Sequence, residues 1–185
     1  MILDFTLENE RVKLTPLSLV NFKELIPVAS EHKLVQFSPS AIETVDALQN
    51  YVEVALKLKK KKAAIPFLIY DKQLNLYAGS TRYMNINWKN RVLHIGSTWI
   101  GSGFQGTGLN TQMKKLMLDH AFEAMEFEKV EFRVDERNVK SRKAVEKLGA
   151  QLEGILREDV YLLDGFKRNT CCYGLLKREW QATQL

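Results

Sequence analysis

Hydrophobic and polar positions change their period several times along the chain, and each change marks a predicted element. Arg11–Leu17 alternates charged and apolar residues, which is the period of a half-buried strand. Ser18–Val28 follows Pro16 and has apolar residues at helical spacing. Ser40-x-x-Glu43 is a capping box and is expected to open a second helix. The buried stripe of that helix is predicted to contain Val45, Leu48, Val52, Ala55 and Leu56.

Three extended segments come next and are joined by short polar turns. They are Ile65–Tyr70, Leu76–Met84 and Val92–Ile100, with turns at Asp71–Asn75 and Asn85–Asn90. Connections this short favour antiparallel neighbours, because parallel strands need a longer crossover.

Helical and extended patterns alternate in the second half of the chain. Thr107–Met125 is predicted as a helix, Lys129–Asp135 as a strand, and Asn138–Leu148 as a short helix closed by Gly149. Two final strands are joined by a hairpin signal: Ala150–Leu163, Asp164-Gly165 and Lys167–Leu175. The order β-α-α-β-β-β-α-β-α-β-β predicts an α/β fold with a mixed sheet.

Composition and charge narrow the class of protein. The chain has 185 residues, of which 45% are hydrophobic and 26% charged, so one globular domain over residues 1–185 is predicted. No apolar run reaches the roughly 20 residues that span a membrane, and the early acids of Met1–Glu8 argue against a signal peptide. Adjacent Cys171 and Cys172 are expected to alternate across a strand. We therefore expect a cytoplasmic protein that contacts no membrane and has no metal centre.

The net charge of +5 favours anionic partners without naming one. Lys57–Lys62 is the densest run of cations, and it falls at the end of a predicted helix. Cations at that end complement the helix dipole, so we predict no nucleic-acid partner.

A glycine-rich segment, Gly101–Asn110, joins a predicted strand to a predicted helix. Glycines let a ligand approach the backbone, and the free N–H groups of a first helical turn attract anions, so phosphate or pyrophosphate is the expected ligand. Gly101-x-Gly103-x-x-Gly106 fits the dinucleotide fingerprint. Gln105–Asn110 fits, less its last residue, the coenzyme A pattern Q/R-x-x-G-x-G/A. A glycine turn without a ligand is the third alternative.

The element order favours the coenzyme A pattern, because a dinucleotide fold opens with its fingerprint, whereas here the fingerprint comes in mid-chain after a meander of three strands. Further motifs support this interpretation. Asp135–Ala150 resembles the N-x-x-S helix of the GNAT acetyltransferases of the RimJ/RimL type, and Leu152–Arg157 resembles their EG-x-L-R strand. The ending Arg168–Trp180 is also similar. The resemblance covers nearly the whole chain and is strongest from Leu76 onward.

This resemblance implies a GNAT fold in which Val92–Ile100 and Lys129–Asp135 are parallel strands that splay apart around acetyl-CoA. The backbones of Trp99 and Ile100 would pair with the pantetheine arm, and Asn138 would bond its amide. The pyrophosphate would be bound at Gln105, Gly106, Thr107, Gly108, Leu109 and Asn110, the last of which departs from the usual Gly or Ala.

The resemblance also implies catalytic roles. Ser141 is predicted to contact the donor and to act as general acid toward the departing thiolate, since the tyrosine of other members falls on Val145. The glutamate base of RimL-like enzymes falls on Val160, and Glu158 on the same strand face is the predicted substitute. Three rivals for the base lie on the splayed strands: His94, Glu131 and Asp135.

An acetyl-CoA-dependent N-acetyltransferase is therefore implied, with direct transfer to a primary amine in a ternary complex. The acceptor, a protein or peptide N-terminus or a small-molecule amine, is expected to face Glu31–Ser40 and Ala150–Lys167. The missing tyrosine and glutamate leave an alternative open, a catalytically weak acyl-CoA-binding module for sensing or assembly. A homodimer is compatible with the resemblance.

Overall fold

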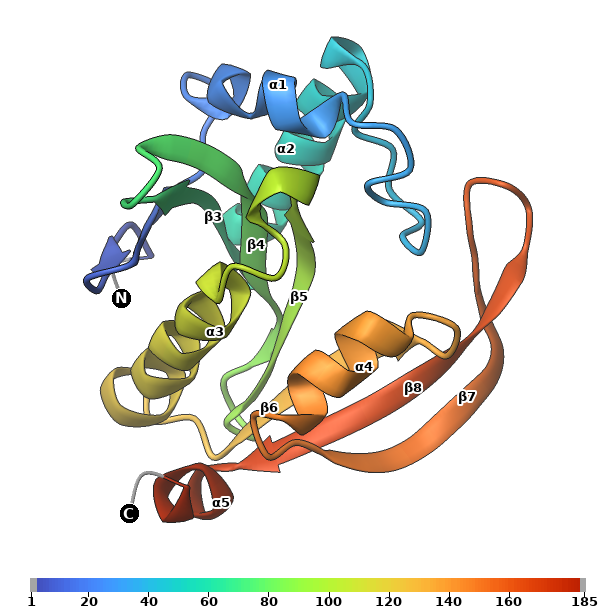
Figure 1. Cartoon of the computed structure of the whole chain (residues 1–185). Coiled ribbons are helices and arrows are strands. Elements are labelled where there is room, and N and C mark those ends of the chain that lie inside the picture. The colour runs from blue at the N-terminus through green and yellow to red at the C-terminus, as the bar shows by residue number, and fades with distance from the viewer. Residues whose placement is uncertain (1–2, 184–185) are drawn as a thin grey trace.

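A computed structural model describes residues 3–183, so the extreme ends of the predicted 1–185 domain lie outside it. Within that range eight strands form one sheet in the order β1-β2-β3-β4-β5-β6-β8-β7, with helices on both faces (Figure 1). The strands are β1 Leu7–Glu8, β2 Val12–Pro16, β3 Ala64–Asp71, β4 Leu76–Asn87, β5 Val92–Ile100, β6 Lys129–Asp135, β7 Gln151–Tyr161 and β8 Lys167–Leu176. The helices are α1 Ile26–Ala29, α2 Val45–Lys60, α3 Leu109–Asp119, α4 Val139–Glu146 and α5 Lys177–Ala182, with 3₁₀ turns at Phe22–Leu25 and Ser102–Phe104 and a π-helical turn at His120–Ala124.

The mixed α/β architecture predicted from the sequence is confirmed, and β5 and β6 have the predicted bounds. Two elements were not predicted. β1 has two residues, too few to show a period, and α5 follows β8 without a turn between them. The first predicted helix is also shorter than expected, because Ser18 N donates to Asn21 Oδ1 and forms a capped turn before Phe22.

The capping box predicted at Ser40 and Glu43 is wrong. Thr44 is the N-cap of α2, and its hydroxyl accepts a hydrogen bond from Ala47 N at 3.2 Å. Glu43 accepts instead from its neighbour Ile42 N. Thr44 was overlooked because the S-x-x-E pattern lies just before it.

The buried stripe of α2 also differs from the prediction. Leu48, Val52 and Ala55 are buried as expected, together with Tyr51, but Val45 is 47% exposed in the first turn. The lysines at the end of α2 lie in its last turn, as predicted from the helix dipole.

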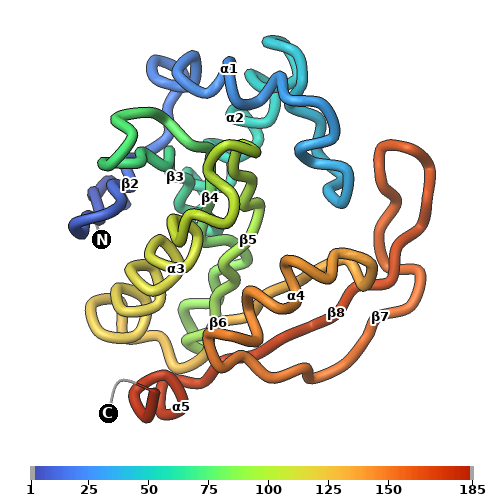
Figure 2. Tube along the Cα trace, viewed as in Figure 1, coloured from blue at the N-terminus to red at the C-terminus, as the bar shows by residue number. Residues whose placement is uncertain are grey.

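The sheet consists of two antiparallel halves joined by one short parallel contact. β5 pairs with β6 only over Val92–His94 and Lys129–Glu131, and beyond these residues the strands diverge (Figures 1 and 2). β4 pairs with β5 from Gly79 to Asn87, with two shifts of register. The shift between Ser80 and Arg82 gives β5 a bulge at Ser97, whose φ is +46°. Bulges increase strand twist, which turns the end of β5 away from β6. The predicted splay is therefore present.

The helices divide between the two faces of the sheet. Tyr83 of β4 donates its hydroxyl to Met117 O of α3 at 2.6 Å, so Tyr83 marks the α3 face. α4 lies on the same face. Its Arg142 donates to the hydroxyl of Tyr173 in β8, and Tyr173 is the register partner of Phe132 in β6. Lys114 of α3 also contacts the Phe132 ring. Tyr51 of α2 packs against the opposite face. The splay thus has α3 and α4 on one side and α2 on the other.

Candidate active site

The glycine loop is an open backbone turn at the start of α3. Gly106 and Gly108 have φ values of +76° and +87°, and a Cβ built on either would meet no atom within 4 Å. Gly108 is the N-cap, so α3 begins at Leu109, two residues later than predicted. Left-handed residues cannot belong to a right-handed helix, and this accounts for the shift. The first-turn N–H groups consequently face an unobstructed approach.

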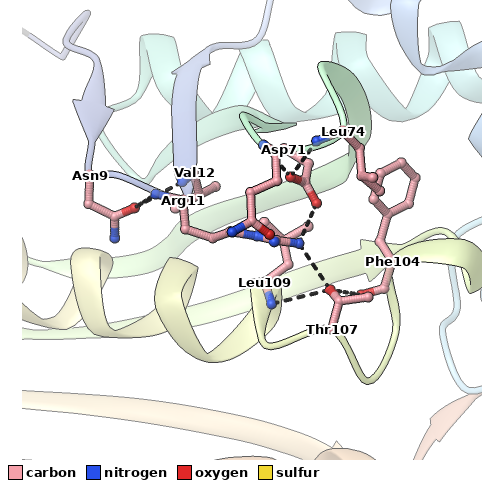
Figure 3. A network of polar contacts seen from close by, with 9 residues as sticks. Asn9, Arg11, Val12, Asp71, Leu74, Phe104, Thr107 and Leu109 are labelled. Atoms are coloured by element: carbon pink, nitrogen blue, oxygen red, sulfur yellow. Dashed lines mark hydrogen bonds and ion pairs between the residues drawn. The ribbon is translucent and has the colours of Figure 1, made fainter.

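A polar network holds this loop to the edge of the sheet (Figure 3). Thr107 Oγ1 donates to Phe104 O at 2.8 Å and accepts from Arg11 Nη2 at 3.2 Å. The same Arg11 nitrogen forms an ion pair with the fully buried Asp71 at 2.7 Å. The loop conformation therefore depends on Arg11, just before β2, and on Asp71 at the end of β3. The sequence interpretation missed Arg11 and Asp71. In the sequence each is only a charged residue at one end of a predicted strand, Arg11 at its start and Asp71 just after it.

An open cavity of about 540 Å³ lies beside this network. Arg11, Thr107 and Gly108 line one part of it, and Asn9, Glu10, Gln73 and Gln112 line the rest.

The other predicted donor contacts on this side lie at the end of β5. Gln105 Nε2 donates to the Ile100 carbonyl at 3.0 Å, so this side chain braces the turn after the strand. The Trp99 carbonyl faces β4, because a Cβ on Gly79 would lie 2.0 Å from it. Backbone groups alternate sides along a strand, so Ile100, and not Trp99, turns its groups away from β4 and toward the splay. Leu109 is buried and Asn110 half-buried in the first turn of α3.

The second half of the predicted donor site lies across the splay. Asn138 is the N-cap of α4, and its side chain accepts from Ser141 N at 3.1 Å. Ser141 is half-buried, and its hydroxyl makes no hydrogen bond within residues 3–183. Parallel strands end at the same edge of a sheet, so the N-termini of α3 and α4 follow β5 and β6 at one edge and flank the opening between them.

Lys114 is a further candidate that the sequence interpretation missed. It lies in α3, is 6% exposed, and places Nζ 5.5 Å from the ring centroid of Phe132, the first residue of β6 beyond its pairing with β5. It forms no ion pair with any carboxylate of the described chain, and burial lowers its pKa to about 8. A charged residue inside the apolar stripe of Leu109–Ala124 was the available signal.

The structure brings together two of the three rival bases. His94 Nε2 lies 2.9 Å from Glu131 Oε2, at the last β5–β6 pair, and His94 Nδ1 lies 3.2 Å from Asn85 Nδ2. Burial lowers the pKa of His94, although the Glu131 carboxylate acts in the opposite direction. His94 is therefore favoured in its neutral form, in which it can accept a proton.

Asp135 and Glu158 have other surroundings. Burial would raise the pKa of Asp135, but hydrogen bonds from Arg137 at 2.8 and 3.1 Å outweigh it, so that the pKa is lowered and the carboxylate stays ionised. Glu158 is exposed on edge strand β7, at a bulge with φ +46°, and β8 separates that strand from β6.

Comparison with known proteins decides the family. A model described as "Acetyltransferase (GNAT) domain" matches residues 11–151. The chain belongs to the GNAT acetyltransferases. GNAT relatives include YdaF of Bacillus subtilis (strain 168), provisionally named a ribosomal N-acetyltransferase, which is 34% identical over 114 residues. That match covers 62% of this chain and spans only 60% of the length of YdaF.

Solved structures agree with this assignment. A protein from T. thermophilus, described provisionally as an acetyltransferase, has a TM-score of 0.85 and 30% identity, with 97% of this chain and 93% of that one covered. A ribosomal-protein-S5-alanine acetyltransferase from Vibrio fischeri has a TM-score of 0.74 and 21% identity over 96% and 99% of the two chains, a likeness of fold alone. The resemblance to GNAT proteins of the ribosomal acetyltransferase type is confirmed.

A second cavity, of about 430 Å³, lies between the segment joining α1 to α2 and the β7–β8 hairpin of this GNAT fold. Arg137 stacks on Phe166 at 3.8 Å, and Arg168 Nη1 donates to Phe37 O at 2.7 Å, which connects the two segments. The parts of the chain predicted to face the acceptor thus meet around one cavity. Its lining consists of His32, Lys33, Val35, Gln36, Phe37, Glu43, Arg137, Leu163 and Asp164.

Two features are absent from residues 3–183. No group of three or more His, Cys, Asp and Glu side chains there is arranged to hold a metal ion. No helix in the same range is long and apolar enough to cross a membrane.

Replacing Thr107 tests whether the polar network maintains the loop. Thr107→Val removes the hydroxyl that binds Arg11 and Phe104 O, and we expect the dissociation constant for coenzyme A, measured by calorimetry, to rise about tenfold, the effect of losing one or two hydrogen bonds. Thr107→Ser keeps the hydroxyl and should bind within about twofold of wild type. Equal affinities of the two variants for coenzyme A would contradict a role of the Thr107 hydroxyl in maintaining the loop.

Replacing Lys114 tests whether this residue takes part in donor binding. Because the pKa of Lys114 is about 8, its ammonium loses charge above that pH, and the affinity of wild type for acetyl-CoA should fall by up to about tenfold per pH unit from pH 8 upward. Lys114→Met should bind more weakly at pH 7 and should lose this pH dependence. The exposed neighbour provides the control, and Lys115→Met should behave as wild type. An unchanged pH dependence in Lys114→Met would contradict the assignment.

Proposed function

We propose that this chain transfers the acetyl group of acetyl-CoA directly to a primary amine within a ternary complex. The observation that carries the proposal is the splay between β5 and β6, with the glycine loop at one side of its open end and the Asn138–Ser141 turn at the other. Unpaired backbone groups along the opening can pair with an extended polar chain such as pantetheine. Membership of the GNAT family supports acetyl transfer in general.

The proposed contacts with coenzyme A rest on charge and on the exposed backbone of the glycine loop. N–H groups from Gly106 to Asn110 would bind the pyrophosphate at the positive end of the α3 dipole, and Lys114 would add a buried cation on the same side. Asn138 would bond the pantetheine amide while continuing to cap α4. Ile100 would contribute its backbone groups, whereas Gln105 and Thr107 act by maintaining the turn.

The reaction requires that a proton leaves the amine and that another reaches the sulfur. As the amine nitrogen attacks the thioester carbonyl, the C–S bond breaks and the electron pair moves to sulfur. The Ser141 hydroxyl, which has no partner in the described chain, would then donate a hydrogen bond or proton to the thiolate. His94, held by Glu131, would accept the amine proton directly or through a water molecule.

The acceptor would enter through the cavity lined by Phe37 and Arg137, between the α1–α2 segment and the β7–β8 hairpin. Similarity to proteins named as ribosomal acetyltransferases supports a protein or peptide α-amine, and a small-molecule amine is the alternative. Three expectations stay predictions: that Glu158 is the base, that the protein is cytoplasmic and that it forms a homodimer.

Thiol release tests the proposal. The protein is incubated with acetyl-CoA and a panel of peptides with free N-termini, amino acids and small amines, and free thiol is measured against a reaction without acceptor. We expect acceptor-dependent release. Tight binding of coenzyme A with no release on any amine would overturn the proposal and favour the acyl-CoA-binding module.

Ser141→Ala tests the proposed general acid. Loss of the hydroxyl should lower kcat by about tenfold or more with little effect on the dissociation constant for coenzyme A, because general acid catalysis acts on the transition state. Turnover equal to wild type would remove Ser141 from the mechanism.

His94→Gln tests the proposed base. The base must be neutral, and burial lowers the pKa of His94. The activity of wild type should therefore decrease only below pH 6.5, the ordinary pKa of a histidine side chain. In His94→Gln the rate at pH 7 should decrease by about 10²-fold, and this acid limb should disappear. An acid limb that persists in the variant would assign the base to another group.

A further inference from the structure

Buried hydrogen-bond donors without a partner gather at one place in this protein. Within residues 3–183, four buried side-chain nitrogen or oxygen atoms have no partner, and three of them are Arg82 Nε, Arg82 Nη2 and Trp99 Nε1. Both side chains lie against the ring of Tyr51, with Arg82 Cζ 4.4 Å from its centroid and the Trp99 ring 6.2 Å from it. Such atoms are rare in folded proteins, so three around one ring require an explanation.

The cluster of Arg82, Trp99 and Tyr51 is connected to the bulge of β5. The Tyr51 hydroxyl donates to Ser97 O at 3.1 Å, and Ser97 is the bulge residue. Arg82 pairs with Gly96, the residue before it. The cluster therefore lies beside the β5 backbone that borders the splay, on the α2 face.

Arg82 differs from the other arginines with little exposure. Arg168 is 9% exposed and donates to Phe37 O and Thr170 Oγ1. Arg11 pairs with Asp71. Arg82 is only 4% exposed and has neither an ion pair nor a hydrogen bond within residues 3–183. A buried cation without a partner is strongly destabilising, so a fold that contains one has a use for it.

The chemistry of the cluster specifies what would complete it. Arg82 and Trp99 can only donate hydrogen bonds, so the missing group must supply acceptor oxygens. The guanidinium adds a full positive charge in a buried position, which favours an anion, and its planar fork matches a carboxylate. Lys114 and the glycine loop belong to the α3 side of the splay, so coenzyme A phosphates would bind on the other face from this cluster.

We propose that Arg82 recognises a carboxylate on the acceptor, close to the amine that is acetylated. The inference rests on the proposed function and specifies its substrate class. Trp99 Nε1 contributes a second donor, and Tyr51 holds the guanidinium over its ring while anchoring α2 to the bulge. Arg82 is thus a specificity-determining residue on the acceptor side.

A carboxylate near a primary amine has two chemical sources. It is the α-carboxylate of a free amino acid, or an acidic side chain next to the N-terminus of a peptide. Matched acceptors separate them: methionine against methioninamide, and peptides that begin Ser-Asp against peptides that begin Ser-Asn. Within each pair only the carboxylate is replaced by a neutral amide.

The experiment measures kcat/KM for both members of each pair by thiol release. Wild type should prefer the carboxylate in one pair by at least about tenfold, the effect of a charge-assisted hydrogen bond. Arg82→Gln should reduce that preference to near unity by slowing the carboxylate acceptor alone, and Arg82→Lys should restore part of it. Arg178→Gln, at an exposed position in α5, is the matched control and should retain the full preference.

Each outcome has a defined meaning. If wild type acetylates the acceptors but prefers the carboxylate in neither pair, the inference is overturned while the proposed function stands. That result requires no variant. A preference that survives in Arg82→Gln also overturns it. Absence of turnover on every amine is a failure of the proposed function instead. Thermal unfolding of each variant verifies that it is folded. If Arg82→Gln does not fold, the carboxylate preference is compared between wild type and Arg82→Lys.

Discussion

Backbone hydrogen bonds join β5 to β6 only over Val92–His94 and Lys129–Glu131, and the features of the site follow from where that pairing stops. Each peptide group beyond this point needs another partner, because an unpaired buried N–H or carbonyl is costly. The bulge at Ser97 and the twist it introduces keep the strands apart. The opening is thus part of the folded structure, and it places the N-termini of α3 and α4 on either side of the same gap.

Charge is distributed unusually around this opening. Lys114 on the α3 face and Arg82 on the α2 face are both buried, and neither has a carboxylate partner in the described chain. The buried carboxylates are paired, Asp71 with Arg11 and Asp135 with Arg137, and the buried Arg168 donates hydrogen bonds to Phe37 O and Thr170 Oγ1. A protein retains unpaired buried charges at functional sites, where ligands complete them. We therefore propose Lys114 for the donor side and Arg82 for the acceptor side of one reaction.

Several features were predictable from the sequence because they depend on neighbours along the chain. The periods of Val92–Ile100 and Lys129–Asp135 predicted both strands to the residue, and the predicted helix Asn138–Leu148 starts at the residue that caps α4. Where local signals competed, prediction failed. The S-x-x-E pattern at Ser40 concealed the true cap, Thr44, and the left-handed Gly108 moved the start of α3 to Leu109.

The sequence by itself determined the order of elements, the glycine loop before α3 and the family resemblance, since motif spacing and periodicity are properties of the chain alone. The tertiary structure decided which distant residues meet. Arg11 reaches Thr107 across 96 positions, His94 meets Glu131, and Arg82 and Trp99 converge on Tyr51. Burial and the absence of a partner are likewise properties of the packed molecule, so no local pattern could indicate that Arg82 and Lys114 are uncompensated charges.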